Sequence, residues 1–311
     1  MNNNAQPRPV KTPWRQIYDR FRKNRLAILC IWVFLALGIL SFLLPILSPY
    51  DYTQPQMQER MQPPSLSHWF GTDAIGIDML TKSFAGLRVS ILVGIFGSLL
   101  TLAIGLIYGA ISGYAGGKVD QIMMRTVDVL YGLPYLAYVI LIIFVFKDYG
   151  EQWFTAQEGF WARSNKYIWE IFLMTLALGS ISWLTIARIV RAQVLSIKQL
   201  EYVEAARALG ASNGRILLRH ILPNLIGPVI VYITLTAPNL MLFESFISFL
   251  GLGIQPPTPS IGKIISDDAL AQLTAQQLPW WLLLFPSLLL ATALFCLNII
   301  GDGLRDAFDV K

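Results

Sequence analysis

Long apolar blocks alternate with polar segments along most of the chain. A helix needs about 20 apolar residues to cross the hydrocarbon core of a bilayer, which is about 30 Å thick. Six blocks approach that length, so the pattern predicts an all-α integral membrane protein with about six transmembrane helices. The predicted spans are Leu26–Leu47, Val89–Ser112, Val127–Phe146, Trp169–Ile189, Ile226–Leu250 and Leu282–Ile300.

Several of the spans contain proline: Pro134 lies in the third, Pro228 and Pro238 in the fifth, and Pro286 in the sixth. Proline in a spanning helix is tolerated where neighbouring helices or water satisfy the freed carbonyl groups. Kinked helices suit a transporter that moves, but proline is also simply commoner in membrane helices than in soluble ones. Both interpretations stay open at this stage.

The polar segments divide the chain into regions. Residues 1-25 form a tail, 26-48 the first span, 49-86 an extracytoplasmic loop, 87-303 a core with five spans, and 304-311 a second tail. Within the core, residues 192-225 form a long cytoplasmic loop. The first tail contains an amphipathic helix, which begins near Thr12 and Pro13 and places Ile17, Tyr18 and Phe21 on one face. Such a helix lies in the membrane interface.

Two outer segments have some local pattern. Tyr50–Trp69 is rich in Pro, Gln and Ser and is typical of an irregular lid. Ile264–Gln277 is expected to form a short helix. Its apolar side chains, Ile264, Ile265, Leu270 and Leu273, are expected to face the membrane, while Asp267 and Asp268 face water.

The distribution of Lys and Arg predicts the orientation. Seven of these residues lie in the first 25 positions, five lie between the fourth and fifth spans, and the alternate loops are poorer in positive charge. The positive-inside rule therefore places both termini in the cytoplasm. The net charge of +5 follows from this topology, and no nucleic-acid partner is needed to explain it.

Composition agrees with a membrane protein. Hydrophobic residues make up 55% of the chain and charged residues 14%, against roughly 45–50% and about 25% in soluble domains. No cleavable signal peptide is evident, because about 25 polar residues precede an apolar run long enough to span. Cys30 and Cys296 lie in apolar blocks, and His68 and His220 are far apart. We therefore expect neither a disulfide nor a metal site.

The segment Glu201–Pro223 carries the clearest local signal. Residues 201–209 are strong helix formers, and Gly210 suits a helix C-terminus that needs a positive φ. Ser212 is expected to cap a second short helix that Pro223 helps to end. This exposed helical hairpin is either an ordinary surface element or a docking element. In the second case Ala205 and Ala206 would permit close approach, and Glu204 and Arg207 would make polar contacts.

The residues of this loop resemble the EAA loop of ABC importer permeases. The likeness rests on Glu204-Ala205-Ala206, Gly210 and Leu222-Pro223 at matching spacing. His220 stands where many permeases carry Ile, and peptide permeases often have His there. Further ordered segments resemble the C-type subunit of oligopeptide and dipeptide permeases over nearly the whole chain. These are Gly71-Thr72-Asp73, Ser112-Gly113-Tyr114, Gly116-Gly117-Lys118-Val119-Asp120, Phe243-Glu244-Ser245-Phe246, Phe249-Leu250-Gly251-Leu252-Gly253 and Gly301-Asp302-Gly303-Leu304-Arg305-Asp306.

Three outward features depart from that family pattern. Ile77 stands where the family usually has Arg, Ile261 stands where it often has Trp, and the loop 147–167 is longer than usual. These departures bear on substrate detail and on contacts with a binding protein, but not on the general function.

The resemblance implies a type I ABC importer permease in the bacterial cytoplasmic (inner) membrane. Its implied partners are a second homologous permease, two ATPases that bind ATP and Mg²⁺, and an extracytoplasmic solute-binding protein. Oligopeptides are the implied cargo, with dipeptides, glutathione or nickel as alternatives. The implied coupling residues are Glu201, Glu204, Ala205, Ala206, Arg207, Gly210, Leu222 and Pro223. The possible contacts with the binding protein are Asp73, Asp78, Asp267 and Asp268.

The chain lacks a phosphate-binding loop of the form G-x-x-x-x-G-K-[ST]. Gly116-Gly117-Lys118-Val119 has the wrong spacing and no hydroxyl after the lysine. We therefore expect a non-catalytic subunit that carries no cofactor, with ATP hydrolysed by partner subunits.

Glu244 is the clearest ionisable residue inside a predicted span, and Ser245 and Ser248 lie beside it. A carboxylate in lipid is costly, so it should face the interior, a partner or water. It either makes structural hydrogen bonds at the interface with the second permease or lines the pathway. A secondary transporter would need more such groups at mid-membrane than Glu244 and Asp128. A membrane-embedded enzyme would need a catalytic constellation, and none is recognisable.

Overall fold

The computed structural model describes residues 13–155, 160–269 and 279–308. Every regular element in this described part is helical. The longer helices are α1 (Pro13–Phe21), α2 (Arg25–Leu47), α3 (Met79–Ala115), α4 (Gly117–Tyr131), α5 (Tyr135–Thr155), α6 (Phe160–Ile197), α7 (Glu201–Ala208), α9 (Leu222–Phe249) and α11 (Trp280–Phe308). The short ones are η1 (Met57–Glu59), α8 (Asn213–Ile216), η2 (Leu217–Ile221), α10 (Ile261–Ile264) and η3 (Ile265–Ala269).

Five helical segments of the described chain are long and apolar enough to cross a membrane: Arg25–Leu47, Met79–Ala115, Lys166–Ile197, Asn213–Phe249 and Trp280–Phe308. A bent pair, Gly117–Tyr131 with Tyr135–Gly150, can supply a sixth span. The predicted all-α membrane fold with about six spans is therefore confirmed.

The third predicted span, Val127–Phe146, is not one helix. It breaks between α4 and α5, which meet at an angle of 86°. Gly132 is a poor helix former, and Pro134 has no backbone N–H and disfavours helical geometry at Leu133. A hydropathy window cannot detect this break because it averages hydrophobicity over residues on both sides.

The hairpin helix that begins at Asn213 does not end at Pro223, contrary to the sequence prediction. It runs through the π-helical turn η2 into α9, so that 213–249 is continuous. In η2 the N–H of Leu222 bonds back to the carbonyl of Leu217. Pro223 falls in the first turn of α9, where a missing N–H costs little. The fifth span is consequently joined directly to the hairpin.

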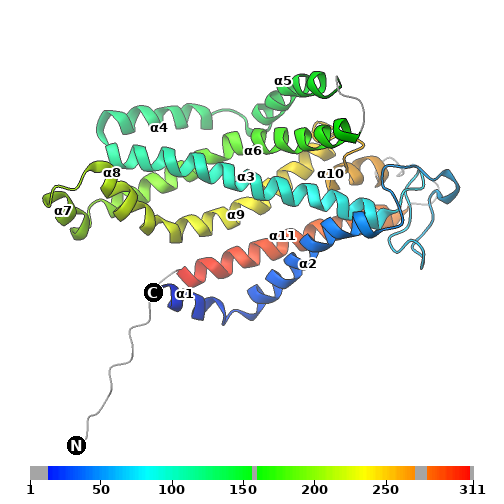
Figure 1. Cartoon of the computed structure of the whole chain (residues 1–311), viewed down its shortest axis with the longest axis horizontal. Helices are drawn as coiled ribbons and strands as arrows, with labels where there is room; N and C mark the ends of the chain where they lie inside the picture. Colours follow the sequence, from blue (N-terminus) through cyan, green and yellow to red (C-terminus); the bar gives the residue numbers. More distant parts are fainter. Residues whose placement is uncertain (1–12, 156–159, 270–278, 309–311) are drawn as a thin grey trace, which may run out of the picture.

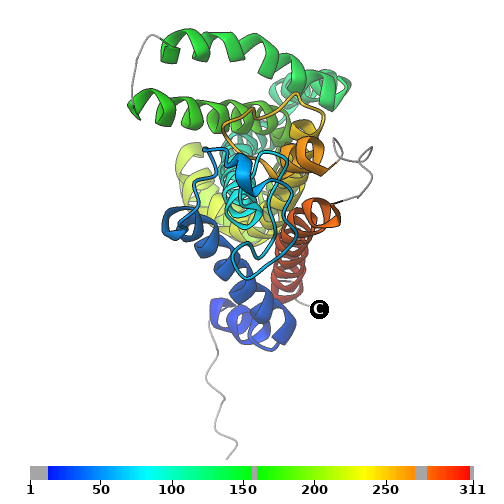
Figure 2. The same cartoon turned by 90° about the vertical axis from the view of Figure 1, so that its right-hand side faces the viewer.

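The spanning helices lie side by side along the long axis of the molecule (Figure 1). α2 and α11 form one side, α4 and α5 the opposite side, and α3, α6 and α9 lie between them in both views (Figures 1 and 2). One end of the bundle, here called the α7 end, holds α1, α7, α8 and the C-terminus. The other, the α10 end, holds loop 48–78 and α10.

Glycines allow α3 and α6 to pack closely. Gly105, Gly109 and Gly113 recur every four residues on one face of α3. A Cβ atom on Gly105 would lie 2.7 Å from the side chain of Ile186, and one on Gly113 would lie 2.9 Å from the carbonyl oxygen of Arg191. Small residues at this spacing let helix backbones approach within a membrane.

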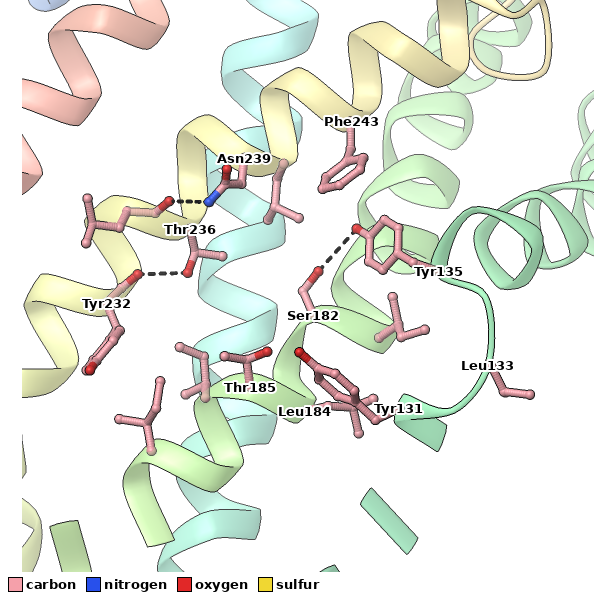
Figure 3. A pocket seen from close by; sticks show the side chains of 15 residues that line it. Tyr131, Leu133, Tyr135, Ser182, Leu184, Thr185, Tyr232, Thr236, Asn239 and Phe243 are labelled. Carbon is pink, nitrogen blue, oxygen red and sulfur yellow. Dashed lines mark hydrogen bonds between the residues drawn. The ribbon is translucent and has the colours of Figure 1, made fainter. Parts of the chain in front are cut away.

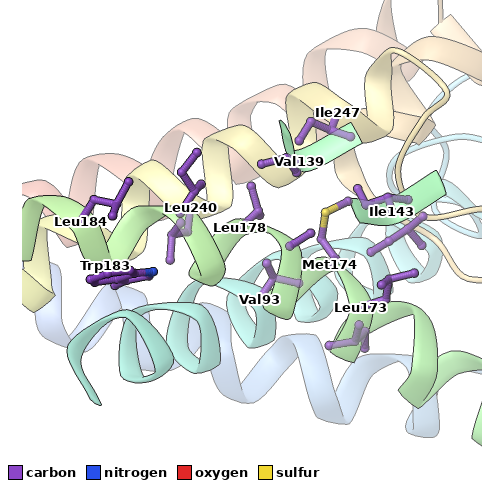
Figure 4. Close-up of a cluster of buried hydrophobic side chains, with 14 of the residues drawn as sticks. Val93, Val139, Ile143, Leu173, Met174, Leu178, Trp183, Leu184, Leu240 and Ile247 are labelled. Carbon is purple, nitrogen blue, oxygen red and sulfur yellow. The ribbon is translucent and has the colours of Figure 1, made fainter. Parts of the chain in front are cut away.

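The apolar core lies where α3, α5, α6 and α9 meet. Figure 4 shows Val93 of α3, Val139 of α5, Leu178 of α6 and Leu240 of α9 packed together. All four side chains are buried.

The amphipathic helix predicted near the N-terminus is present as α1, which begins at Pro13. Its expected cap, Thr12, lies outside the described residues. Phe21 packs near Gly303 of α11, so α1 is tied to the last span, whereas Tyr18 is exposed.

Candidate functional site

The hairpin at the α7 end has the turn that the sequence predicts. Gly210 has φ +82°, in the left-handed region where glycine is favoured. Ser212 occupies the capping position before α8, but its side chain accepts no capping bond. Tyr114 at the end of α3 instead donates a hydrogen bond of 2.9 Å to Asn213, which ties the hairpin to α3.

One face of α7 is fixed to the spanning helices. Val203 is fully buried in a cluster that contains side chains from α3, α6, α8, η2 and α9. The amide of Asn224 on α9 donates to the Tyr202 hydroxyl at 3.1 Å. Leu222 is half-buried against the same cluster, and Pro223 is exposed. The hairpin is thus packed against side chains of three spans, α3, α6 and α9.

The opposite face of α7 is free in this chain. Glu201, Glu204, Ala205 and Arg207 are exposed, and Ala206 is half-buried. A short helix that is fixed on one side and open on the other has the geometry of a docking element. The structure brings all the predicted coupling residues together at this end of the bundle.

An ion pair that the sequence did not indicate braces the same end. Arg191 of α6 donates from Nε and Nη2 to the two oxygens of Asp120 on α4, at 2.5 and 2.6 Å. Ser112 of α3 also donates to Asp120, at 2.6 Å. Bidentate pairs of this kind fix geometry as well as charge, so α3, α4 and α6 are held together beside α7.

Glu244 lies inside the chain, fully buried in α9. Its carboxylate accepts hydrogen bonds from four serine hydroxyls. The donors are Ser90 at 2.6 Å, Ser245 at 3.2 Å, Ser248 at 3.0 Å and Ser260 at 2.7 Å. These serines come from α3, α9 and the segment before α10.

The burial of Glu244 bears on both sequence interpretations. With no exposed surface, Glu244 neither lines a pathway nor reaches an interface with another subunit in this structure. Ser245 and Ser248, named with it, are also buried and serve as its hydrogen-bond donors. Glu244 ties the segment before α10 to two spans because Ser260 can reach it there.

The four aspartates proposed to contact a binding protein differ in how far they are buried. Asp73, Asp78 and Asp268 are buried, so only Asp267 is exposed and available for such a contact. Asp78 caps α3 and accepts from Thr81. The three buried aspartates are paired within their own chain, and contact with a binding protein stays a prediction.

The buried aspartates belong to a charge cluster at the α10 end. The ammonium of Lys82 lies 2.7 Å from Asp73 and 2.6 Å from Asp268. Burial raises the pKa of Asp268 to about 6, although the nearby Lys82 opposes that rise. His68 lies between Asp78, at 2.9 Å, and Glu59, at 3.2 Å. These contacts hold loop 48–78 and η3 against the start of α3.

The expected membrane-facing side of this outer helix is also corrected. Ile264 is buried against Met79 and Leu282, so it packs inward on the bundle. Leu270 and Leu273 lie outside the described residues. The contact depends on residues distant in sequence, which a local pattern cannot reveal.

A cavity of about 430 Å³ opens between α6, α9 and the bend that joins α4 to α5. Figure 3 shows Ser182 and Thr185 on α6, Tyr131 and Tyr135 at the two sides of the bend, and α9 across from them. α9 contributes Tyr232, Thr236, Asn239 and Phe243. We name this cavity the α6–α9 pocket.

Sequence reasoning missed the α6–α9 pocket, although a signal was present. Tyr232, Thr236 and Asn239 recur every three or four residues in a largely apolar part of the span. This spacing places them on one face of a helix. A polar stripe within a spanning helix faces protein or water in preference to lipid.

Comparison with known proteins gives consistent matches. The model of the family described as binding-protein-dependent transport system inner membrane component matches residues 105–311. The model described as the N-terminal TM domain of oligopeptide transport permease C matches residues 12–64.

Individual relatives match over almost their full length. An oligopeptide transport system permease protein OppC of Haemophilus influenzae is 42% identical over 96% of this chain and 88% of the relative. A dipeptide transport system permease protein DppC of Bacillus subtilis is 39% identical over 98% and 88%. The OppC protein of Escherichia coli K12 is 40% identical over 96% and 91%.

Proposed function

Because the chain belongs to the family of inner membrane components of binding-protein-dependent transport systems, we propose that it is a permease subunit of an ATP-driven peptide importer. Peptides are proposed as cargo because relatives at 39% to 42% identity are named for oligopeptide or dipeptide transport. The membrane would be the bacterial cytoplasmic membrane. Oligopeptides are favoured over dipeptides, since most of these relatives are oligopeptide permeases.

The observation that carries the proposal is the α7 hairpin. Val203 buries its inner face in the cluster formed with α3, α6, α8 and α9, and its outer face is exposed. A separate ATPase that docked on this outer face would move the hairpin and, with it, the spans in that cluster. The loop residues Glu201, Glu204, Ala205, Ala206, Arg207 and Gly210 would form or support that docking surface.

The remaining partners follow from the same family. We propose a second homologous permease, two ATPases that hold ATP and Mg²⁺, and a solute-binding protein at the α10 end. This chain would itself be non-catalytic and carry no cofactor. Asp267 is the aspartate at the α10 end that is exposed and so available to the binding protein.

Uptake by purified transporter tests the proposed function. The complex is purified through a tag on this chain, reconstituted into proteoliposomes with its binding protein, and supplied with radiolabelled tetra-alanine. We expect uptake only when ATP and Mg²⁺ are present on the α7 side, and the same uptake after ionophores collapse all ion gradients. Uptake that needs an ion gradient and no ATP would identify a secondary transporter instead.

The proposed orientation places the α7 end in the cytoplasm and the α10 end outside, in keeping with the Lys and Arg distribution. Gln56 and Asn213 are exposed at opposite ends. The test uses cells whose outer layers have been removed but whose cytoplasmic membrane is intact. A Cys at position 56 should then react with an impermeant thiol reagent, and one at position 213 should react only after lysis. The native Cys30 and Cys296 are buried and give a low background. Labelling at position 213 before lysis would reverse the orientation.

A further inference from the structure

The α6–α9 pocket has mostly apolar walls, with several polar groups and no charged ones among its described residues. Its described lining consists of aromatic, aliphatic, hydroxyl and amide side chains, with no Asp, Glu, Lys or Arg. Arg188, which lies between the lining residues Thr185 and Ile189, is paired with Asp128 at 2.7 Å. Its guanidinium also lies 4.3 Å from the ring centre of Tyr131. The pocket therefore cannot select a ligand by net charge.

Three polar lining groups already donate a hydrogen bond to their own helix. Ser182 donates to the carbonyl of Leu178 at 2.8 Å, and Thr236 donates to that of Tyr232 at 2.7 Å. The amide of Asn239 donates to the Leu235 carbonyl at 2.9 Å. Figure 3 shows the bonds of Thr236 and Asn239 as dashed lines along α9.

A hydroxyl group has one hydrogen and two lone pairs, and an amide oxygen has two lone pairs. After these bonds, Ser182 and Thr236 present only acceptors to the pocket, whereas Asn239 presents its Oδ1 and one remaining N–H. Tyr135 lies 3.4 Å from Ser182 and must donate to it, since the Ser182 hydrogen is used. The walls on α6 and α9 thus offer acceptors at Ser182, Thr236 and Asn239, together with hydroxyls of Thr185 and Tyr232 that can also donate.

Uncharged acceptors and donors together suit a ligand that brings neutral N–H and C=O groups. A peptide main chain carries one N–H on each non-proline residue and one C=O on every residue, whatever its side chains. A cavity of about 430 Å³ is also within the range of about 300–1,000 Å³ for ligand pockets.

We propose that the α6–α9 pocket binds the main-chain N–H groups of the transported peptide, through Ser182, Thr236 and Asn239, and so accepts peptides regardless of side-chain charge. This inference rests on the proposed function. It assigns the chemistry of recognition inside the membrane to acceptor groups of this chain.

The test compares two double variants with identical chemistry. Thr236→Val with Asn239→Leu removes two acceptors from the pocket. Thr292 and Asn298 on α11 make the same bonds to their own helix, at 2.7 and 3.0 Å, and are exposed away from the pocket. Thr292→Val with Asn298→Leu is therefore the matched control. Thr236→Ser keeps the hydroxyl and should retain uptake, which separates lost acceptors from altered folding.

ATP-driven uptake is measured in proteoliposomes, with binding protein saturated by tetra-alanine, Ala-Lys-Ala-Ala or Ala-Glu-Ala-Ala. We expect the pocket double variant to lose about tenfold in uptake, the size expected for two hydrogen bonds, and to lose it equally for all three peptides. The control variant should match the wild type. Equal uptake by the pocket and control variants, or a loss confined to one charged peptide, would overturn the inference and leave peptide transport standing. No uptake of any peptide by the wild type would instead contradict the proposed function.

Discussion

Replacing Glu244 with leucine should markedly destabilise the permease. The change leaves four buried serine hydroxyls without their common acceptor. Leaving a buried donor unpaired costs about 1–3 kcal/mol, but serines within helices can turn to their own carbonyls. Ser260 lies outside a helix and has less freedom to do so. We expect a total cost of about 3 kcal/mol and a fall in the unfolding temperature of the purified complex of roughly 5–10 °C.

Two further variants separate the hydrogen bonds from the charge. Glu244→Gln keeps one acceptor oxygen, so it should cost only about 1 kcal/mol. Adding Ser90→Ala and Ser260→Ala to Glu244→Leu removes two of the orphaned donors and should restore part of the stability. A Glu244→Leu protein as stable as the wild type would show that the serine cluster does not hold the segment before α10 in place.

The sequence predicts the helical content, the approximate spans and the turn at Gly210, because these depend on local hydrophobicity and backbone preference. It does not predict the 86° bend between α4 and α5. Both sides of the bend fall within one predicted span, and only the order of Gly132, Leu133 and Pro134 marks it. The bend matters to function, since Tyr131 and Tyr135 at its two sides line the α6–α9 pocket.

Burial of the polar residues also escapes sequence reasoning. Lys82 pairs with Asp268, which is 186 positions away, and Glu244 is reached by Ser90 from another span. Each carboxylate stands out in the sequence, so sequence reasoning assigns it to a surface that contacts a partner or substrate. Its actual role depends on which distant side chain the fold brings to it, and one chain without aligned relatives carries no record of such pairs.

Replacing Ala205 with aspartate should abolish coupling to ATP hydrolysis. Ala205 is exposed on α7, so the change should leave this chain folded. In the proposed complex the same side chain packs in a groove of the ATPase, where an unpaired charge is strongly disfavoured. A penalty of about 3 kcal/mol would weaken docking by roughly 150-fold.

Gly210→Val tests the turn that positions α7. At φ +82° a β-branched residue is strained by about 1–3 kcal/mol. A Cβ there would meet no neighbouring atom within 4 Å, so the strain is confined to the backbone. We expect this variant to bind ATPase more weakly than the wild type but better than Ala205→Asp. Gln58→Asp, which adds the same charge to an exposed position at the α10 end, is the control for both.

The amount of ATPase that copurifies with tagged Ala205→Asp permease, relative to Gln58→Asp, tests the central claim most directly. The account predicts normal membrane insertion of both variants, ATPase recovered with Gln58→Asp at the wild-type level, and almost none recovered with Ala205→Asp. ATPase recovered equally with both variants, together with equal ATP-driven uptake of tetra-alanine, would contradict the assignment of α7 as the site through which ATP hydrolysis drives this permease.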